Sequence, residues 1–191
     1  MAILVQKFGG SSLANGEKIR RAAGLSLSAV RQGFQVVVVV SAQGDLTDQL
    51  LTQAGELCRA PSPRELDQLL SAGEQMSAAL FAMALDEFGA PAVSLTGWQA
   101  GILTGRTHQN ASIQTVRPGR ILAELNQGKI AVVAGFQGIS AAGEVTTLGR
   151  GGSDITAVAL AAALKGERCQ IYTDVDGVYT ADPRLVPTAR R

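Results

Sequence analysis

Five consecutive valines at positions 36–40 constrain the fold of this 191-residue chain more than any other feature. A β-branched run without polar alternation is typical of a strand covered on both faces, as the strands of parallel sheets are. We place this strand at 35–41, and other apolar, β-prone runs fall at 3–8, 92–96, 130–135 and 169–173. Helical patterns separate the runs, at 15–32, 45–59, 63–88, 118–127 and 153–164. This alternation predicts an α/β fold with a mainly parallel sheet and helices on both of its faces.

The helix at 63–88 has the clearest boundaries. Ser62 suits the N-cap, Pro63 suits the first helical position, and Glu65 completes a capping box. Gly89 follows as a stop signal. We expect the core-facing side of this helix to consist of its larger apolar residues, together with one alanine: Leu66, Leu69, Leu70, Met76, Leu80, Met83 and Ala84.

The composition excludes several classes of protein. Hydrophobic residues make up 46% of the chain and charged residues 17%, which is incompatible with a disordered, low-complexity protein. A net charge of +1 argues against a nucleic-acid or anionic-membrane partner. No apolar run approaches the roughly 20 residues that span a bilayer, and the N-terminus lacks a signal-peptide pattern. The two cysteines show neither a disulfide framework nor metal-ligand spacing, so we expect reduced thiols, no metal cage and a cytoplasmic location.

Polar, glycine-rich motifs follow the predicted strands, and ligands of open α/β sheets usually bind beyond the carboxyl ends of the strands. The first strand runs into KFGGSS at 7–12. Paired glycines allow a ligand close to the backbone, and the lysine provides positive charge for a phosphoryl group. The motif is neither a Walker A loop nor a dinucleotide-binding fingerprint, and a plain turn with a solvated lysine explains it equally well. The second motif, SAQGD at 41–45, is more simply a loop with a helix cap.

The third motif, TTLGRGGSD at 146–154, carries the strongest signal for a ligand. Three glycines surround Arg150 directly before an alanine-rich helix. A helix N-terminus binds anions, and an arginine can hold a carboxylate through two hydrogen bonds. Asp154 is either a partner of the helix dipole or a carboxylate that orients a lysine or a metal at phosphates. The fourth motif, YTDVDGVYTADPR at 172–184, suits a nucleotide, although its Asp-Gly pair also fits a hairpin turn.

Two single residues have open roles. Glu74 lies about 80° around its helix from Leu66, at the border of the predicted apolar stripe. A solvated flank residue is the simpler interpretation, and an acid facing a ligand amine is the alternative. His108, the only histidine, has no neighbouring pattern for a catalytic triad or a zinc site.

Taken in order, the motifs KFGGSS, SAQGD, TGWQAG, VAGFQG, TTLGRGGSD and YTDVDGVYTADPR resemble those of the aspartate kinases, within the amino acid kinase superfamily. The similarity covers essentially the whole chain. It implies a three-layer αβα sandwich around a mainly parallel sheet, with ATP, Mg²⁺ and L-aspartate at the carboxyl edge. It also implies transfer of the γ-phosphoryl group of ATP to the side chain of aspartate, which gives 4-phospho-L-aspartate for lysine, threonine and methionine synthesis.

The resemblance gives a role to each matching residue. Lys7 is expected to neutralise charge during phosphoryl transfer, and Asp154 to organise the phosphate site. ATP is expected to contact Lys7, Gly9, Gly10, Ser11, Thr173, Asp174, Tyr179 and Arg184. The amino acid is expected to contact Ser41, Thr47, Glu74, Arg150, Gly151, Gly152 and Ser153. Within that set, Glu74 would face the ammonium group, while Arg150, Gly151, Gly152 and Ser153 would hold the carboxylate.

Family members continue past the position of Arg191 with a second lysine near the phosphates, further kinase-domain strands and ACT regulatory domains. We therefore expect residues 1–191 to form a C-terminally truncated, partial catalytic domain without ACT domains. The full-length form is expected to be a homo-oligomer, such as a dimer. Two alternatives remain: a kinase for a related acid such as N-acetylglutamate or glutamate, and a non-catalytic fragment that binds ATP or aspartate or dimerises.

Overall fold

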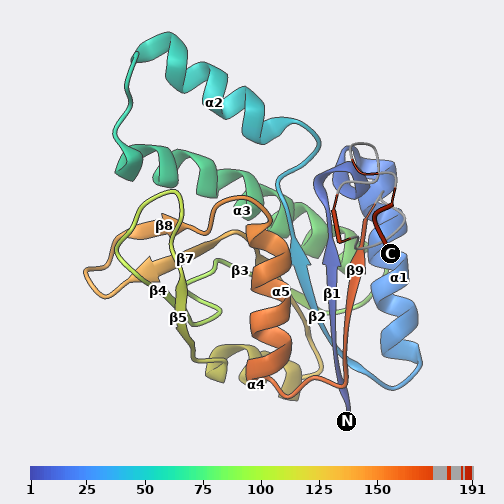
Figure 1. Ribbon diagram of the computed structural model, residues 1–191. Coiled ribbons are helices and arrows are strands. Elements are labelled where there is room, and N and C mark those ends of the chain that lie inside the picture. The colour runs from blue at the N-terminus through green and yellow to red at the C-terminus, as the bar shows by residue number, and fades with distance from the viewer. Residues whose placement is uncertain (174–179, 182–185, 187, 191) are drawn as a thin grey trace.

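The computed structural model describes residues 1–173, 180–181, 186 and 188–190. Its centre is a five-stranded parallel sheet in the order β3-β6-β2-β1-β9 (Figure 1). The strands are β1 (Ile3–Phe8), β2 (Gln35–Val40), β3 (Ala92–Leu95), β6 (Ile130–Ala134) and β9 (Arg168–Tyr172). The predicted strands and the parallel sheet are confirmed, with no strand end displaced by more than one residue.

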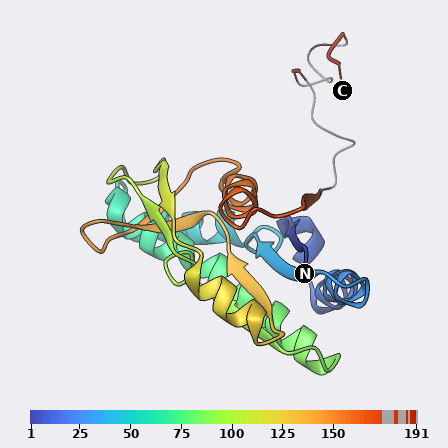
Figure 2. The same ribbon diagram turned by 90° about the horizontal axis from the view of Figure 1, so that it is seen from below.

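Helices cover both faces of this sheet, as predicted. On one face lie α1 (Gly16–Arg31) and α3 (Pro63–Glu87), and on the other lie α4 (Gly119–Asn126) and α5 (Gly152–Ala163). Figure 2, seen along the strands, shows α1 and α5 on opposite sides. The valines of β2 divide between the two cores: Val36, Val38 and Val40 pack towards α1 and α3, while Val37 and Val39 pack towards α4 and α5. Their burial on both faces explains why this run shows no polar alternation.

The structure adds a second sheet that the sequence patterns do not predict. It contains four short strands in the order β5-β4-β7-β8 and is mixed, because only β4 and β7 run parallel. These strands are β4 (Ile102–Thr104), β5 (Ile113–Val116), β7 (Gln137–Ser140) and β8 (Val145–Thr147). Strands of three or four residues are too short to show a period, so this sheet has no clear signature in the sequence.

The buried face of α3 differs from the predicted one. The helix begins as expected, because the Ser62 side chain accepts a hydrogen bond from the Glu65 N–H at 3.3 Å. The predicted stripe is correct for Leu70, which is buried, and for Ala84, which packs against the core, but it was wrong for Met76, Leu80 and Met83, which are 47%, 37% and 64% exposed. The buried face instead mixes apolar residues with small and polar ones: Asp67, Leu70, Ser71, Gly73, Glu74, Ser77, Ala78, Phe81, Ala82 and Leu85.

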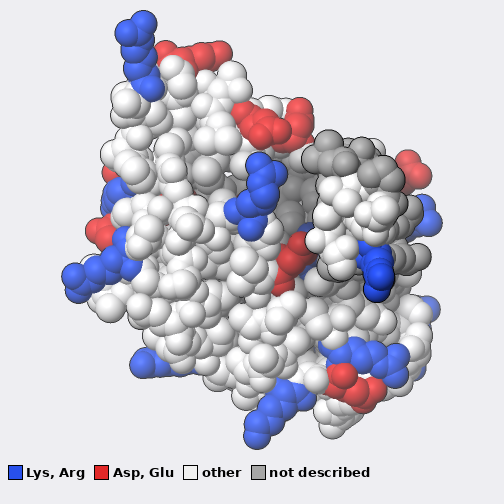
Figure 3. All heavy atoms as spheres, in the orientation of Figure 1, with Lys and Arg blue, Asp and Glu red and all other residues white. Residues whose placement is uncertain are grey.

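One helix stands apart from the sheet. α2 (Leu46–Leu57) has no buried residue and projects from the carboxyl edge of the strands (Figure 1). Charged side chains of both signs are interspersed over the face shown in Figure 3. Within the described part of the chain, no helix is both long enough and apolar enough to cross a bilayer.

Candidate active site

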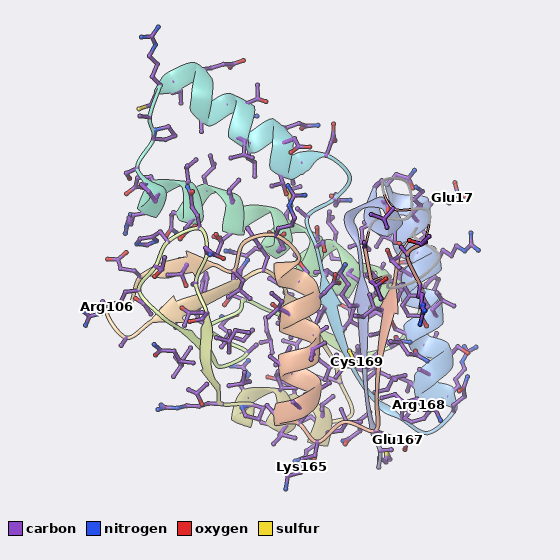
Figure 4. The ribbon with its side chains drawn as sticks, in the orientation of Figure 1. Glu17, Arg106, Lys165, Glu167, Arg168 and Cys169 are labelled. Carbon is purple, nitrogen blue, oxygen red and sulfur yellow. The ribbon has the colours of Figure 1, made fainter. Side chains whose placement is uncertain are left out.

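A cavity of about 540 Å³ opens at the carboxyl edge of the parallel sheet. It is walled by the loops after β1, β2 and β8 and by α2, α3 and the start of α5. The residues that line it are Lys7, Gly10, Ser41, Ala42, Gly44, Thr47, Leu51, Leu70, Glu74, Phe136, Gly149, Arg150, Gly151, Gly152, Ser153 and Asp154. By contrast, Lys165, Glu167 and Arg168, labelled in Figure 4, lie near the amino end of β9. The first three motifs, KFGGSS, SAQGD and TTLGRGGSD, therefore meet at one site beyond the carboxyl ends of the parallel strands, as expected for an open α/β sheet.

The loops after β1 and β2 are joined directly to each other. A short 3-10 helix, η1 (Gly10–Leu13), follows β1, and the Gly44 N–H donates a hydrogen bond to the Gly10 carbonyl at 3.0 Å. The Gln43 side chain donates to the Leu13 carbonyl at 2.8 Å. A Cβ atom at position 10 would lie 2.6 Å from the Ala42 carbonyl oxygen. Glycine at this position is therefore required for the packing of the two loops, in addition to any approach of a ligand.

An ion pair joins the first and third motifs. The Lys7 Nζ lies 2.7 Å from Asp154 Oδ1, and the two side chains are 11% and 46% exposed. Lys7 is the penultimate residue of β1, and Asp154 lies in the first turn of α5. The two groups attract each other by charge but form no aligned hydrogen bond. This arrangement favours the interpretation of Asp154 as a carboxylate that orients a lysine.

Glu74 is the most unusual group in the cavity. Its side chain is buried, its Oε1 accepts a hydrogen bond from the Ala42 N–H at 3.1 Å, and its Oε2 has no donor among the described residues. Burial raises the pKa of Glu74 to about 7, although the Ala42 N–H lowers it in part. The simpler interpretation of Glu74 as a solvated flank residue was therefore wrong. A cation bound in the cavity would stabilise the ionised form of this carboxylate.

The third motif presents Arg150 at the rim of the cavity. Gly149 and Gly151 have φ values of 77° and 73°, a left-handed conformation that glycine adopts without strain. This bend brings the N-terminus of α5 to the cavity, where helix N–H groups attract anions. Arg150 is exposed, and no carboxylate of the described residues pairs with it. The rim thus offers a guanidinium and a helix N-terminus to an anionic ligand.

The remaining predicted site residues fall into three groups. Ser41 and Thr47 lie in the cavity, from the β2 loop and α2. Gly9 is beside Lys7, because a Cβ atom there would be 3.5 Å from Nζ. Ser11 and Thr173 line a separate hollow of about 360 Å³ between the first motif and β9. Asp174, Tyr179 and Arg184 lie outside the described residues.

The sequence patterns assign no role to two residues of the site, Ala42 and Phe136, although they lie in the motifs SAQGD and VAGFQG. The Ala42 N–H holds Glu74, and Phe136 lines the cavity. Both follow buried strands, and that position is the signal that could have pointed to them. Among the described residues, no three His, Cys, Asp or Glu side chains are grouped so as to hold a metal ion.

The chain is similar in sequence and in fold to known proteins. The model of the amino acid kinase family matches residues 2–191. The aspartokinase of Mycobacterium tuberculosis is 58% identical over 192 residues, which cover all of this chain and 46% of that protein. The crystal structure of aspartate kinase from Synechocystis has a TM-score of 0.81 at 50% identity, covering 99% of this chain and 31% of that one.

E. coli aspartokinase III, crystallised with aspartate and ADP, has a TM-score of 0.84 at 31% identity, covering 99% of this chain and 53% of that one. The chain spans about half the length of the curated relatives that it matches. Because the family model matches nearly every residue and the fold is shared with solved aspartate kinases, the chain belongs to the amino acid kinase family.

Proposed function

We propose that this chain is part of the catalytic domain of an aspartate kinase, which transfers the γ-phosphoryl group of ATP to the side-chain carboxylate of L-aspartate. Relatives named aspartokinase support the proposal, as does a similar structure that contains aspartate and ADP. The product would be 4-phospho-L-aspartate, the starting compound for lysine, threonine and methionine synthesis. A cytoplasmic location, where ATP is available, belongs to the same proposal.

The observation that carries the proposal is the buried, under-coordinated carboxylate of Glu74 in the same cavity as Arg150. A carboxylate and a guanidinium are the groups that recognise the ammonium and the α-carboxylate of a free amino acid. N-acetylglutamate has a neutral amide in place of the ammonium group, so it would leave Glu74 without a cationic partner. Glu74 therefore favours an acceptor with a free amino group.

The other side of the cavity suits phosphates. A carboxylate acceptor is already a nucleophile at neutral pH, so the reaction needs no strong base. It needs two anions held together while the charge on the transferred phosphoryl group is neutralised. Lys7, steered by Asp154, would supply that positive charge, and the positive end of the α5 helix dipole would add to it.

Mg²⁺ fits this site without a protein cage. The ion usually binds through one or two carboxylates and the phosphates of its substrate, which agrees with a single half-exposed carboxylate, Asp154, beside the phosphate-binding groups. When bound, Mg²⁺ would reduce the negative charge of the β- and γ-phosphates. We propose that Asp154 both steers Lys7 and faces the ion.

The direct test is release of ADP by the intact protein, with aspartate, glutamate and N-acetylglutamate compared as acceptors. We expect turnover that depends on aspartate. Turnover with N-acetylglutamate alone would contradict the choice of substrate. ATP binding in calorimetry without turnover on any acceptor would favour a non-catalytic binding module.

We also propose that the protein forms a homodimer, through the outer face of α3. Residues 75–85 of this helix contain no charged side chain, yet Met76, Leu80 and Met83 are exposed. Helices that are apolar on all sides are usually buried. Sedimentation should show a dimer that Met83→Lys weakens and that Leu57→Lys, on the exposed end of α2, leaves intact. A monomeric unsubstituted protein would contradict this assignment.

A further inference from the structure

A second polar cluster, centred on Asp67 of α3, lies beside the cavity but does not line it. The Asp67 side chain is completely buried, and its carboxylate meets three donors. Thr147 Oγ1 donates to Oδ1 at 2.6 Å, the Gln109 N–H donates to both oxygens at 3.0 and 3.1 Å, and His108 Nδ1 lies 2.7 Å from Oδ2. Both oxygens are thus occupied by protein groups, so Asp67 has a role other than binding a ligand directly.

The donors come from two segments that support the loop of Arg150. Thr147 is the last residue of β8, three positions before Arg150. The other segment, 108–110, belongs to the loop between β4 and β5, in which Figure 4 labels Arg106. This segment packs against Gly149, because a Cβ atom there would lie 3.0 Å from Asn110 Oδ1 and 3.1 Å from the Gln109 carbonyl oxygen. Asp67 therefore ties together the strand that leads into the Arg150 loop and the segment that supports it.

Asp67 also connects this loop to Glu74. The two acids are seven residues apart on α3, which places them two turns apart on the same buried face. Glu74 stands on the helix that Asp67 anchors, and Arg150 stands on the loop that Asp67 anchors. An amino acid that contacts both groups needs a fixed distance between them, and a misplacement of 1 Å can cost about 100-fold in rate.

The backbone of the supporting segment is held in a conformation that needs this support. Gln109 has a φ of 63°, which is uncommon for a residue other than glycine. Its N–H is one of the donors to Asp67, so the carboxylate stabilises the strained position. A different contact also attaches α3 to the small sheet, because the Gln137 side chain of β7 donates a hydrogen bond to the Ser71 carbonyl at 2.9 Å.

From these contacts we infer that Asp67 is a positioning residue for the amino-acid site, which sets the Arg150 loop relative to Glu74 through Thr147 and the segment 108–110. This inference rests on the proposed function. In this inference Asp67, Thr147 and Gln109 do not contact the ligand. They affect amino-acid binding through the position of the Arg150 loop.

The test measures steady-state kinetics of the intact protein with aspartate and ATP varied separately. Asp67→Asn and Thr147→Val should raise the KM for aspartate by about tenfold or more, with less than a twofold change in the KM for ATP. Thr147→Ser, which keeps the hydroxyl group, should restore the aspartate KM. Gln137→Met, the matched control, breaks a different buried link of α3 and should lower the melting temperature without raising the aspartate KM.

The inference is overturned if the aspartate KM of the Asp67 and Thr147 variants stays within twofold, or if both KM values rise equally. An aspartate KM raised to the same extent in Gln137→Met would also overturn it, because any loosening of α3 would then suffice. If Asp67→Asn does not fold, the comparison of Thr147→Val with Thr147→Ser decides. No aspartate-dependent turnover by the unsubstituted protein would instead refute the proposed function, and the inference with it.

Discussion

Replacement of Glu74 by glutamine should change substrate binding and stability in opposite directions. Glutamine keeps the size of the side chain, and its oxygen can still accept the hydrogen bond from Ala42. It removes the charge that would pair with the ammonium group of aspartate. Loss of one member of a buried, hydrogen-bonded charge pair costs about 2–4 kcal/mol, which corresponds to a roughly 30- to 900-fold rise in the KM for aspartate. The KM for ATP should remain unchanged.

Stability without substrate should instead increase in Glu74→Gln above neutral pH. The folded-state pKa of Glu74 is raised from 4.5 to about 7, so the folded protein holds this proton more tightly than the unfolded chain does. Stability from this group is complete below pH 4.5 and is lost as pH rises through 7, by about 3 kcal/mol in all. Glutamine does not ionise and avoids this loss, although a buried amide without a partner at the position of Oε2 would offset about 1–3 kcal/mol of the gain.

Urea unfolding at pH 5.5 and pH 8.5 measures the stability change, and initial rates measure the KM for aspartate. The stability of the unsubstituted protein should fall between the two pH values by more than that of Glu74→Gln. If the free energy of unfolding depends on pH equally in the two proteins, the pKa of Glu74 is not raised by burial. An unchanged aspartate KM would remove Glu74 from the binding site.

Three further outcomes follow from the site. Because Glu74 must ionise to bind an ammonium group, kcat/KM for aspartate should fall about tenfold per unit as pH drops below 7, and a flat profile from pH 6 to 8 would contradict this. Lys7→Ala should lower kcat by about 100- to 1000-fold, with aspartate binding in calorimetry within twofold, and an unaltered kcat would exclude Lys7 from phosphoryl transfer. Gly10→Ala should destabilise the protein by about 1–3 kcal/mol in thermal unfolding, because its Cβ would meet the Ala42 carbonyl. Gly24→Ala, the control, meets open space within α1 and should be neutral or stabilising by up to about 1 kcal/mol.

The parallel sheet could be predicted because its signals are local and long enough to read. Val36–Val40 shows burial on both faces directly, and Ser62 with Glu65 marks the start of α3 through groups three residues apart. The small sheet could not be predicted in the same way, since its strands have only three or four residues and gain their stability from distant partners.

The candidate site was predicted in outline for the same reason. Lys7 and Ser41 end or follow predicted strands, which places them at one edge before any contact is known, whereas Arg150 reaches that edge after β8, a strand that the sequence did not predict. The burial of Glu74 could not be predicted from the sequence, because helical spacing and residue size placed Met76 and Met83 on the core face, and both are exposed. The burial of Glu74 depends in part on Ala42, 32 positions away in the chain, which donates to Glu74 and packs beside Gly73. The Asp67 cluster depends on contacts over 40 or more positions, which no local pattern records.

The lack of buried residues in α2 separates part of the cavity wall from the cooperative core. Amide protons of β2, in the middle of the sheet, should exchange with solvent only when the whole domain unfolds. Those of α2 should exchange through local openings of low free energy. Thr47 and Leu51 belong to this loosely held helix, while Glu74 faces them from a firmly packed one. A substrate in the cavity would therefore contact the loosely held α2 and the firmly packed α3 together. Ordering of α2 on binding would then reduce the net free energy of binding. Slower hydrogen exchange of the α2 amides on addition of aspartate would measure this ordering residue by residue.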